Sequence, residues 1–171
     1  MLWIYAWFYL AWGLNYSQKD FYGRTNIPYT AYTPEIFQSF VDNYIDKLNA
    51  SYTDVTSIDE PLVCRESVHG YNQISDTLGL HRPPHSSPRV KTMLFTPFIS
   101  MVGVTGSMGP FFCEFTLNGD LLPPQYPATY AHELAHFLGI TSEAEANFYA
   151  YQVCTRSQVK EIRFSGYFSV L

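Results

Sequence analysis

The sequence predicts an α+β fold that is mostly helical and carries a small antiparallel sheet. Strand-like segments in the middle of the chain are followed by helical ones, and the strand–helix–strand alternation of a parallel sheet is missing. The length of 171 residues suits one domain with a buried core and is short for two.

Composition narrows the class of protein. Hydrophobic residues make up 47% of the chain, aromatic residues 18% and charged residues only 15%, which argues against disorder and predicts an unusually apolar surface. The net charge is -5, and the lysines and arginines are scattered along the sequence. We therefore expect no nucleic-acid partner and no electrostatic binding to anionic lipid.

The N-terminus is an uncharged run of apolar and aromatic residues from Leu2 to Trp12. It is shorter than the roughly 20 residues that span a bilayer. Its tryptophans and tyrosines are typical of the interfacial end of a membrane helix. We expect residues 1–16 to be the end of a membrane-associated helix and residues 17–171 to form the domain, the alternative being a buried N-terminal core helix.

Local signals predict the following elements. A proline in the first turn and an apolar stripe predict a helix over residues 33–48, and a second helix is expected over residues 61–78, where Gly79 ends it. Residues 90–106 predict one or two strands broken near Pro97. Residues 112–118 alternate in polarity, which predicts a half-exposed strand, placed provisionally at a sheet edge.

The stretch "HELAH" carries the strongest chemical signal. A helix is expected over residues 127–137, ended by Gly139, and it places His132 and His136 one turn apart on the same face. Two such imidazoles can hold one zinc ion at about 2.0–2.1 Å. Glu133 could then act as general base on a water at the open side of the metal. The alternative is a helix that merely carries two surface histidines.

A catalytic zinc needs a third protein ligand. Ser142 stands where the longer HExxHxxGxxH pattern has its third histidine, so the candidates are Glu143 and Glu145. Ser142 and Glu145 fit a capping box at the start of a helix. Glu143 shares its helical face with small residues such as Ala146. Glu145 shares its face with Tyr149, and we expect that face to be wetter, that is, more exposed to solvent. Glu143 is therefore the favoured ligand and Glu145 the alternative.

Further residues receive supporting roles. Asn147, one turn beyond Glu143, is placed to hold the outer N–H of a ligand histidine. Arg163 and Tyr167 are the candidates for stabilising the charge of a transition state. The strand over residues 112–118 could bind an extended peptide by edge pairing, with Glu114 near the rim of the cleft, although an ordinary half-buried strand is the simpler interpretation.

These motifs carry a resemblance. HExxH followed by Glu-x-x-x-Asn resembles the gluzincin arrangement of zinc peptidases, and "EAEAN" is similar to the ExxAD motif of the membrane-embedded HtpX-type proteases, although the interval from His136 to Glu143 is shorter than gluzincins usually show. A closer similarity is to an uncharacterised family of membrane-anchored bacterial HExxH proteins, a domain of unknown function. Four blocks in order carry it: "WGLNYS", "VGVTG", "HELAH" with "EANF", and "RFSGY".

The residues and the resemblance together imply a zincin-like metallopeptidase domain. Zn²⁺ is the expected cofactor, held by His132, His136 and Glu143, while Glu133 activates the water for hydrolysis of a peptide bond. The expected partners are a peptide or protein substrate and a membrane that the N-terminal segment contacts. In the family, transmembrane helices precede the "WGLNY" block, which implies the bacterial inner membrane, with the extracytoplasmic side favoured. The alternatives are a non-catalytic zinc-binding membrane sensor or scaffold, and a lipid- or partner-binding module.

Overall fold

The computed structural model describes residues 2–84, 88 and 90–171. Its elements follow one another as α1 (Leu2–Ala11), the 3-10 helix η1 (Gly13–Ser17), α2 (Phe21–Thr25), α3 (Pro34–Ser51), α4 (Glu60–Leu78), β1 (Val90–Thr92), α5 (Thr96–Met101), β2 (Gly106–Gly109), β3 (Glu114–Leu117), α6 (Tyr126–Phe137), α7 (Glu143–Thr155) and α8 (Lys160–Phe168). The predicted α+β class, mostly helical with a small sheet, is confirmed.

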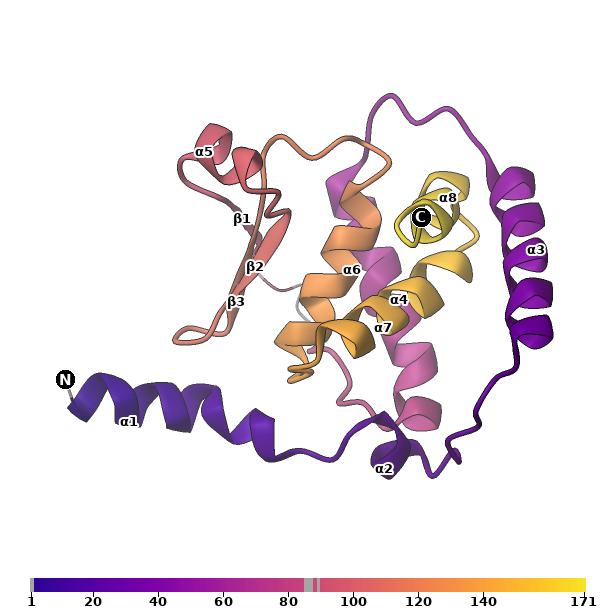
Figure 1. The fold of residues 1–171 in the computed structure, drawn as a ribbon. Helices are drawn as coiled ribbons and strands as arrows, with labels where there is room; N and C mark the ends of the chain where they lie inside the picture. Colours follow the sequence, from indigo (N-terminus) through magenta and orange to yellow (C-terminus); the bar gives the residue numbers. More distant parts are fainter. Residues whose placement is uncertain (1, 85–87, 89) are drawn as a thin grey trace.

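Helix α6 lies between the sheet on one side and helices α4, α7 and α8 on the other, while α3 packs outside α8 (Figure 1). Helix α1 extends away from these packed elements, on the side of the molecule where the sheet lies (Figure 1). The central position of α6 matters because this helix carries the "HELAH" stretch.

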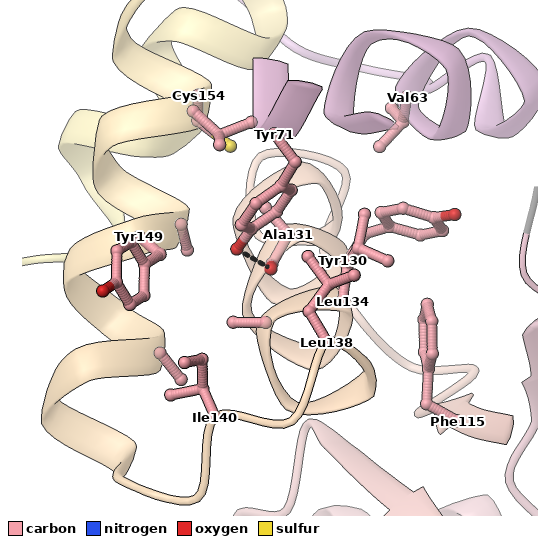
Figure 2. Close-up of a cluster of buried hydrophobic side chains, with 14 of the residues drawn as sticks. Val63, Tyr71, Phe115, Tyr130, Ala131, Leu134, Leu138, Ile140, Tyr149 and Cys154 are labelled. Atoms are coloured by element: carbon pink, nitrogen blue, oxygen red, sulfur yellow. Dashed lines mark hydrogen bonds between the residues drawn. The ribbon is translucent and has the colours of Figure 1, made fainter. Parts of the chain in front are cut away.

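The core surrounds α6 (Figure 2). Ala131 and Ala135 are fully buried, and such small side chains let neighbouring helices approach closely. The buried Tyr71 hydroxyl on α4 donates a hydrogen bond of 2.7 Å to the carbonyl oxygen of Ala131 (Figure 2). Packing and this bond hold the inner face of α6, and they leave the next residue, His132, facing the other way. Other large buried side chains are Tyr130, Tyr149, Phe115, Leu134 and Ile162.

Two helix boundaries were readable from local chemistry. The Thr33 side chain accepts a hydrogen bond from the Ile36 amide at the start of α3, where Pro34 occupies the first turn. Gly79 ends α4 in the left-handed conformation, with φ of 64°. Both predictions are confirmed.

The sheet differs from prediction. Its strand order is β1-β3-β2, with β3 antiparallel to β2 but parallel to β1, so the sheet is mixed and not antiparallel throughout. The strand predicted over residues 112–118 is the central one, because β1 and β2 flank it and its Phe115 and Leu117 are buried. The expectation of an edge strand there was wrong, and β2 is the edge strand that faces α6.

The strands predicted over residues 90–106, broken near Pro97, are confirmed in part: β1 occupies Val90–Thr92 and the chain does break before Pro97, but the rest of the stretch up to Gly106 is not strand. Thr96–Met101 forms the short helix α5, with Pro97 in its first turn, where the missing N–H of proline costs nothing. This helix carries the chain from β1 to β2 on the far side of β3, and the turn after β2 reverses the chain again, so β1 and β3 run in the same direction.

The N-terminal segment forms helix α1, which buries none of its residues, so the alternative of a buried core helix does not hold. Trp7 contacts Phe111 and Phe112 in the turn between β2 and β3, with ring centroids 5.7 and 5.4 Å apart. Among the described residues, the structure holds no helix of sufficient length and apolarity to cross a membrane.

Candidate metal centre

Helix α6 presents His132 and His136 from adjacent turns of one face, as their spacing requires. Their Nε2 atoms lie 3.0 Å apart and their rings meet edge to face. His136 is buried and His132 is partly buried. The two ring nitrogens therefore converge on one point at the surface of the helix.

A tight turn brings the third residue to this point. Gly139 adopts a φ of 97°, a conformation open to glycine, and a Cβ atom there would crowd Asn15 and Gln18 at 3.1–3.3 Å. The Ser142 side chain then accepts from the Glu145 amide and starts α7. Glu143 is the first residue of α7, and its carboxylate oxygens lie 3.1 Å from Nε2 of His132 and 3.4 Å from Nε2 of His136. The short interval from His136 to Glu143 is therefore long enough for Glu143 to reach both histidines.

Hydrogen bonds on the far side of each ring set the state of the histidines. Nδ1 of His136 lies 2.7 Å from the carbonyl oxygen of Ile140, which can only accept, so Nδ1 carries the proton. Nδ1 of His132 lies 2.7 Å from Oδ1 of Asn147, and the same assignment follows when the amide oxygen accepts. A histidine ring that is neutral and carries its proton on Nδ1 has a lone pair on Nε2, and in both residues Nε2 faces the centre.

Three acceptors thus face one another with no donor assigned between them. Burial lowers the pKa of His132, and the neighbouring His136 lowers it further, which disfavours a proton as the bridging charge. The ligand atoms of His132, His136 and Glu143 all lie within 4.8 Å of one another. Ligands about 2.05 Å from a tetrahedral zinc lie about 3.3 Å apart, close to the spacings seen here. The donor set and its geometry fit a divalent cation.

Glu133 lies beside this cluster with its carboxylate against β2. Its side chain is only 4% exposed, and its Oε2 atom is buried without a hydrogen-bond partner. A Cβ atom on Gly106 would lie 2.3 Å from Oε1 of Glu133, so the carboxylate occupies space that only glycine leaves. Burial raises the pKa of Glu133 to about 8, and the negative charge of Glu143 adds to the shift.

A cavity of about 750 Å³ opens over the cluster. It is lined by segments that are far apart in sequence: the end of α1 with η1, strand β2, helix α6, the start of α7 and the C-terminal residues. Sequence reasoning assigned Gly106, Trp12 and Tyr16 no place at this cavity. The "WGLNYS" block, as a part of the family resemblance, was the available signal for the last two. Its position in the chain gives no reason to expect it near α6.

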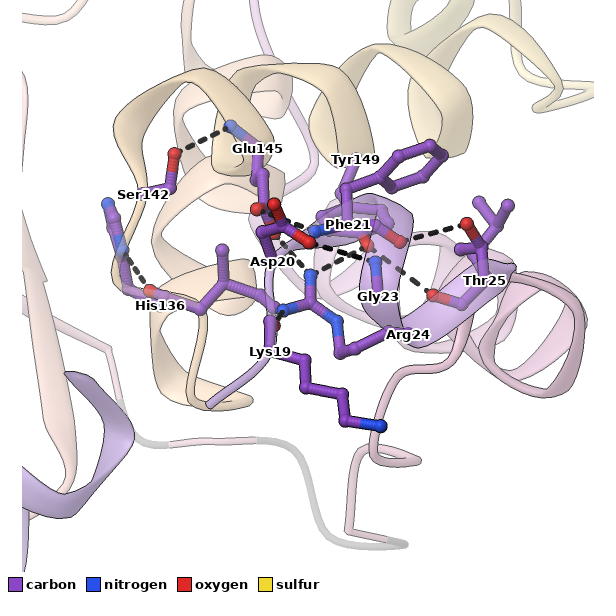
Figure 3. Close-up of polar contacts among 12 residues, drawn as sticks. Lys19, Asp20, Phe21, Gly23, Arg24, Thr25, His136, Ser142, Glu145 and Tyr149 are labelled. Carbon is purple, nitrogen blue, oxygen red and sulfur yellow. Dashed lines mark hydrogen bonds and ion pairs between the residues drawn. The ribbon is translucent and has the colours of Figure 1, made fainter. Parts of the chain in front are cut away.

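Glu145 has a different role from the one predicted. Its carboxylate forms an ion pair with Arg24 and accepts a hydrogen bond of 3.0 Å from the Phe21 amide (Figure 3). The capping box is therefore only half formed, because Ser142 caps the helix while Glu145 does not bond back. Helix α2 covers this face of α7 and Tyr149 is fully buried, so the expectation of a wetter face was wrong.

Three predicted site residues lie elsewhere. Arg163 donates a hydrogen bond of 3.1 Å to the carbonyl oxygen of Ser157, and the Tyr167 ring packs against Tyr44 and Tyr151. Glu114 forms an ion pair of 2.7 Å with Lys91. None of these three lines the cavity. The structure thus brings together His132, Glu133, His136, Glu143 and Asn147, and leaves Arg163, Tyr167 and Glu114 outside.

The fold and the cluster define a mostly helical α+β protein with a group of histidine and glutamate side chains suited to a metal. Residues 1–171 match the family model described as "Protein of unknown function (DUF3810)", and the chain belongs to this family. The expectation of a family without a known function is thereby confirmed. No curated protein and no solved structure matches the chain significantly.

Proposed function

We propose that this protein is a zinc-dependent peptide-bond hydrolase, with His132, His136 and Glu143 as zinc ligands. The observation that carries the proposal is the meeting of three hydrogen-bond acceptors at 3.0, 3.1 and 3.4 Å. Such an arrangement is repulsive unless a cation lies between the acceptors. Asn147 supports the proposal because it holds the outer nitrogen of His132 at 2.7 Å, as partners of zinc-bound histidines commonly do.

The mechanism follows from the position of Glu133. When bound, zinc would polarise the substrate carbonyl and lower the pKa of a water beside it. The Glu133 carboxylate accepts the proton of the attacking water and returns it to the nitrogen of the leaving amine. A buried carboxylate oxygen that lacks a partner is suited to this work, because no competing hydrogen bond has to be broken.

Strand β2 supports a peptide as substrate. It is an edge strand of the sheet, and its Gly106, Ser107 and Met108 line the cavity beside Glu133. An extended peptide can pair with a free strand edge through backbone hydrogen bonds. We therefore propose β2, and not residues 112–118, as the strand that pairs with the peptide. Such pairing would hold the scissile bond of the peptide near the cluster.

Glu133 also favours an enzyme over a zinc-binding sensor or scaffold. A scaffold needs the ligands alone, whereas a buried carboxylate without a partner is costly to stability and contributes nothing to holding the ion. The "HELAH" stretch with Glu143 and Asn147 keeps its similarity to gluzincin and HtpX-type sites as further support. We also retain association of residues 1–16 with the bacterial inner membrane, supported by the exposed apolar surface of α1.

Zinc content of purified protein tests the site. We expect one zinc per chain for the wild type and for Glu145→Ala, and loss of zinc for Glu143→Ala, measured by elemental analysis after dialysis. Glu145→Ala is a matched control, because both residues are acids in the first turn of α7. Absence of stoichiometric zinc, or zinc loss in the control alone, would refute the site.

Glu133→Gln tests catalysis separately. We expect this variant to keep zinc but to lose cleavage of a proteome-derived peptide library, followed by mass spectrometry. A scaffold would show no cleavage in either protein. Cleavage that persists in Glu133→Gln would exclude Glu133 as the base.

A further inference from the structure

Helix α5 and its flanks expose a cluster of large apolar side chains. No charged residue occurs from Met93 to Cys113. Exposure of so many apolar side chains to water is unfavourable, and contiguous apolar patches of this kind mark interaction sites. We call these residues the α5 patch: Leu94, Phe95, Phe98, Met101 and Val102, exposed by 80%, 76%, 71%, 83% and 73%.

The polarity of α5 is inverted relative to a helix on a water-soluble surface. The half-buried Ser100 hydroxyl donates a hydrogen bond of 2.7 Å to the exposed Asp120 and accepts one of 3.0 Å from the buried Asn118. The Thr96 hydroxyl donates to the carbonyl oxygen of Met93. Polar groups are thus satisfied within the protein while apolar groups point outward, which is the arrangement expected against an apolar medium.

A second uncharged segment lies on the same side of the molecule. Residues 2–18 carry no charge, and α1 contacts the turn between β2 and β3 through Trp7 and Phe8, which pack on Phe111. Phe112 in this turn is itself exposed. In Figure 1, α5 and this turn lie on the side toward which α1 projects.

We propose that the α5 patch is a second membrane contact, and that it inserts into the interface of a lipid bilayer beside α1. Lipid is the favoured occupant because the whole stretch from Met93 to Cys113 carries no charge, whereas partner proteins are usually met by a polar rim around an apolar centre. Its phenylalanines, leucine and methionine, together with the tryptophans of α1, are typical of interfacial segments.

The cavity borders both contacts, because Phe8 and Trp12 line it together with Gly103 and Val104, which follow the patch. A protein held at the bilayer by α1 and the α5 patch has this cavity close to the membrane surface. The substrate class that follows is a peptide segment next to the bilayer. This consequence rests on the proposed hydrolase function, whereas the membrane contact itself does not.

Vesicle binding tests the contact. We expect the full chain to sediment with phosphatidylcholine vesicles, and Phe95→Asp with Phe98→Asp to weaken partitioning by about tenfold or more, since two large apolar side chains are lost from the bilayer. The control pair is Ile36→Asp with Phe40→Asp on α3, where the side chains are exposed by 59% and 57%, and it should leave partitioning unchanged. Equal effects of both pairs would overturn the proposal.

Two further measurements keep the interpretations apart. An environment-sensitive fluorophore on Met101→Cys, in a Cys113→Ser background, should shift to the blue with vesicles, and on Phe40→Cys it should not. If Phe95→Asp with Phe98→Asp instead converts a dimer into monomers without changing vesicle binding, a second copy covers the patch and the lipid proposal is wrong. His132→Ala should keep full vesicle binding, so loss of zinc and loss of membrane contact are separate results.

Discussion

The backbone of Gly106 in β2 lies directly against the carboxylate of Glu133 in α6. A Cβ atom at position 106 would be 2.3 Å from Oε1 and 2.6 Å from Cγ of Glu133. Because Glu133 is nearly fully buried, its side chain cannot simply swing into water. The position of the candidate base therefore depends on the absence of one methyl group on a neighbouring strand.

Gly106→Ala should consequently displace Glu133 and reduce peptide cleavage by at least about tenfold, with zinc content unchanged. Overpacking of this kind costs about 1–3 kcal/mol of stability. Gly70→Ala on α4 is the control, because a Cβ atom there would crowd Val153 at 2.7 Å while neither residue lines the cavity. Full cleavage by Gly106→Ala would show that the contact with β2 does not position the base.

A pH-dependent loss of stability is expected from Glu133 in metal-free protein. Its pKa rises from 4.5 in the unfolded chain to about 8 in the folded one, so between these values the unfolded state releases a proton that the folded state keeps. The free energy of unfolding then falls as pH rises, by up to about 1.4 kcal/mol per pH unit for one group. Below pH 4.5 this contribution is fully present, and above pH 8 it has been lost.

Glu133→Gln removes this titration. Urea denaturation with chelator present should run from below pH 4.5 up to pH 8. Between pH 4.5 and 8 the free energy of unfolding of the variant should rise relative to that of the wild type, and below pH 4.5 the difference between the two should not change with pH. Parallel pH profiles for the two proteins would mean that Glu133 is not held in the buried, unpartnered environment described above.

Asn147 should affect metal affinity through His132. Asn147→Leu removes the acceptor of the Nδ1 proton at a side chain of similar size, and loss of such a partner typically weakens zinc binding by about 10- to 100-fold. Asn147→Asp should retain or increase affinity, because a carboxylate accepts the same proton. Competition with a chromophoric chelator measures both, and an unchanged affinity in Asn147→Leu would contradict the role.

The candidate metal centre was readable from sequence largely because its signals are local. The spacing of His132 and His136 fixes one helical face, Gly139 fixes the turn, and Ser142 fixes the start of α7, so Glu143 follows. Gly106 was not readable, because nothing near it in sequence indicates that β2 packs against α6. The mixed sheet was missed for the same reason, since pairing of β1 with β3 depends on a crossover through α5.

Glu145 shows how a local signal can be correct in part. The Ser142-x-x-Glu145 pattern did start a helix, but the glutamate side chain turned to Arg24, more than a hundred residues away in sequence. A buried charge partner offers a stronger interaction than an exposed amide at the helix end. Tertiary packing decides between the ion pair with Arg24 and the bond to the N-cap amide, and the local sequence pattern gives no information about that packing.

The Arg24–Glu145 pair should hold the N-terminal segment onto α7. Both side chains are largely buried, and Arg24 also donates a hydrogen bond of 3.1 Å to the Tyr149 hydroxyl. Arg24→Met leaves Glu145 without its cation, so we expect a loss of about 1–3 kcal/mol of stability, less than for a fully buried pair. Adding Glu145→Gln should recover part of that loss, because the unpaired charge is gone. A double-mutant cycle by chemical denaturation measures the coupling, and strictly additive effects of the two substitutions would show that the pair contributes no interaction of its own.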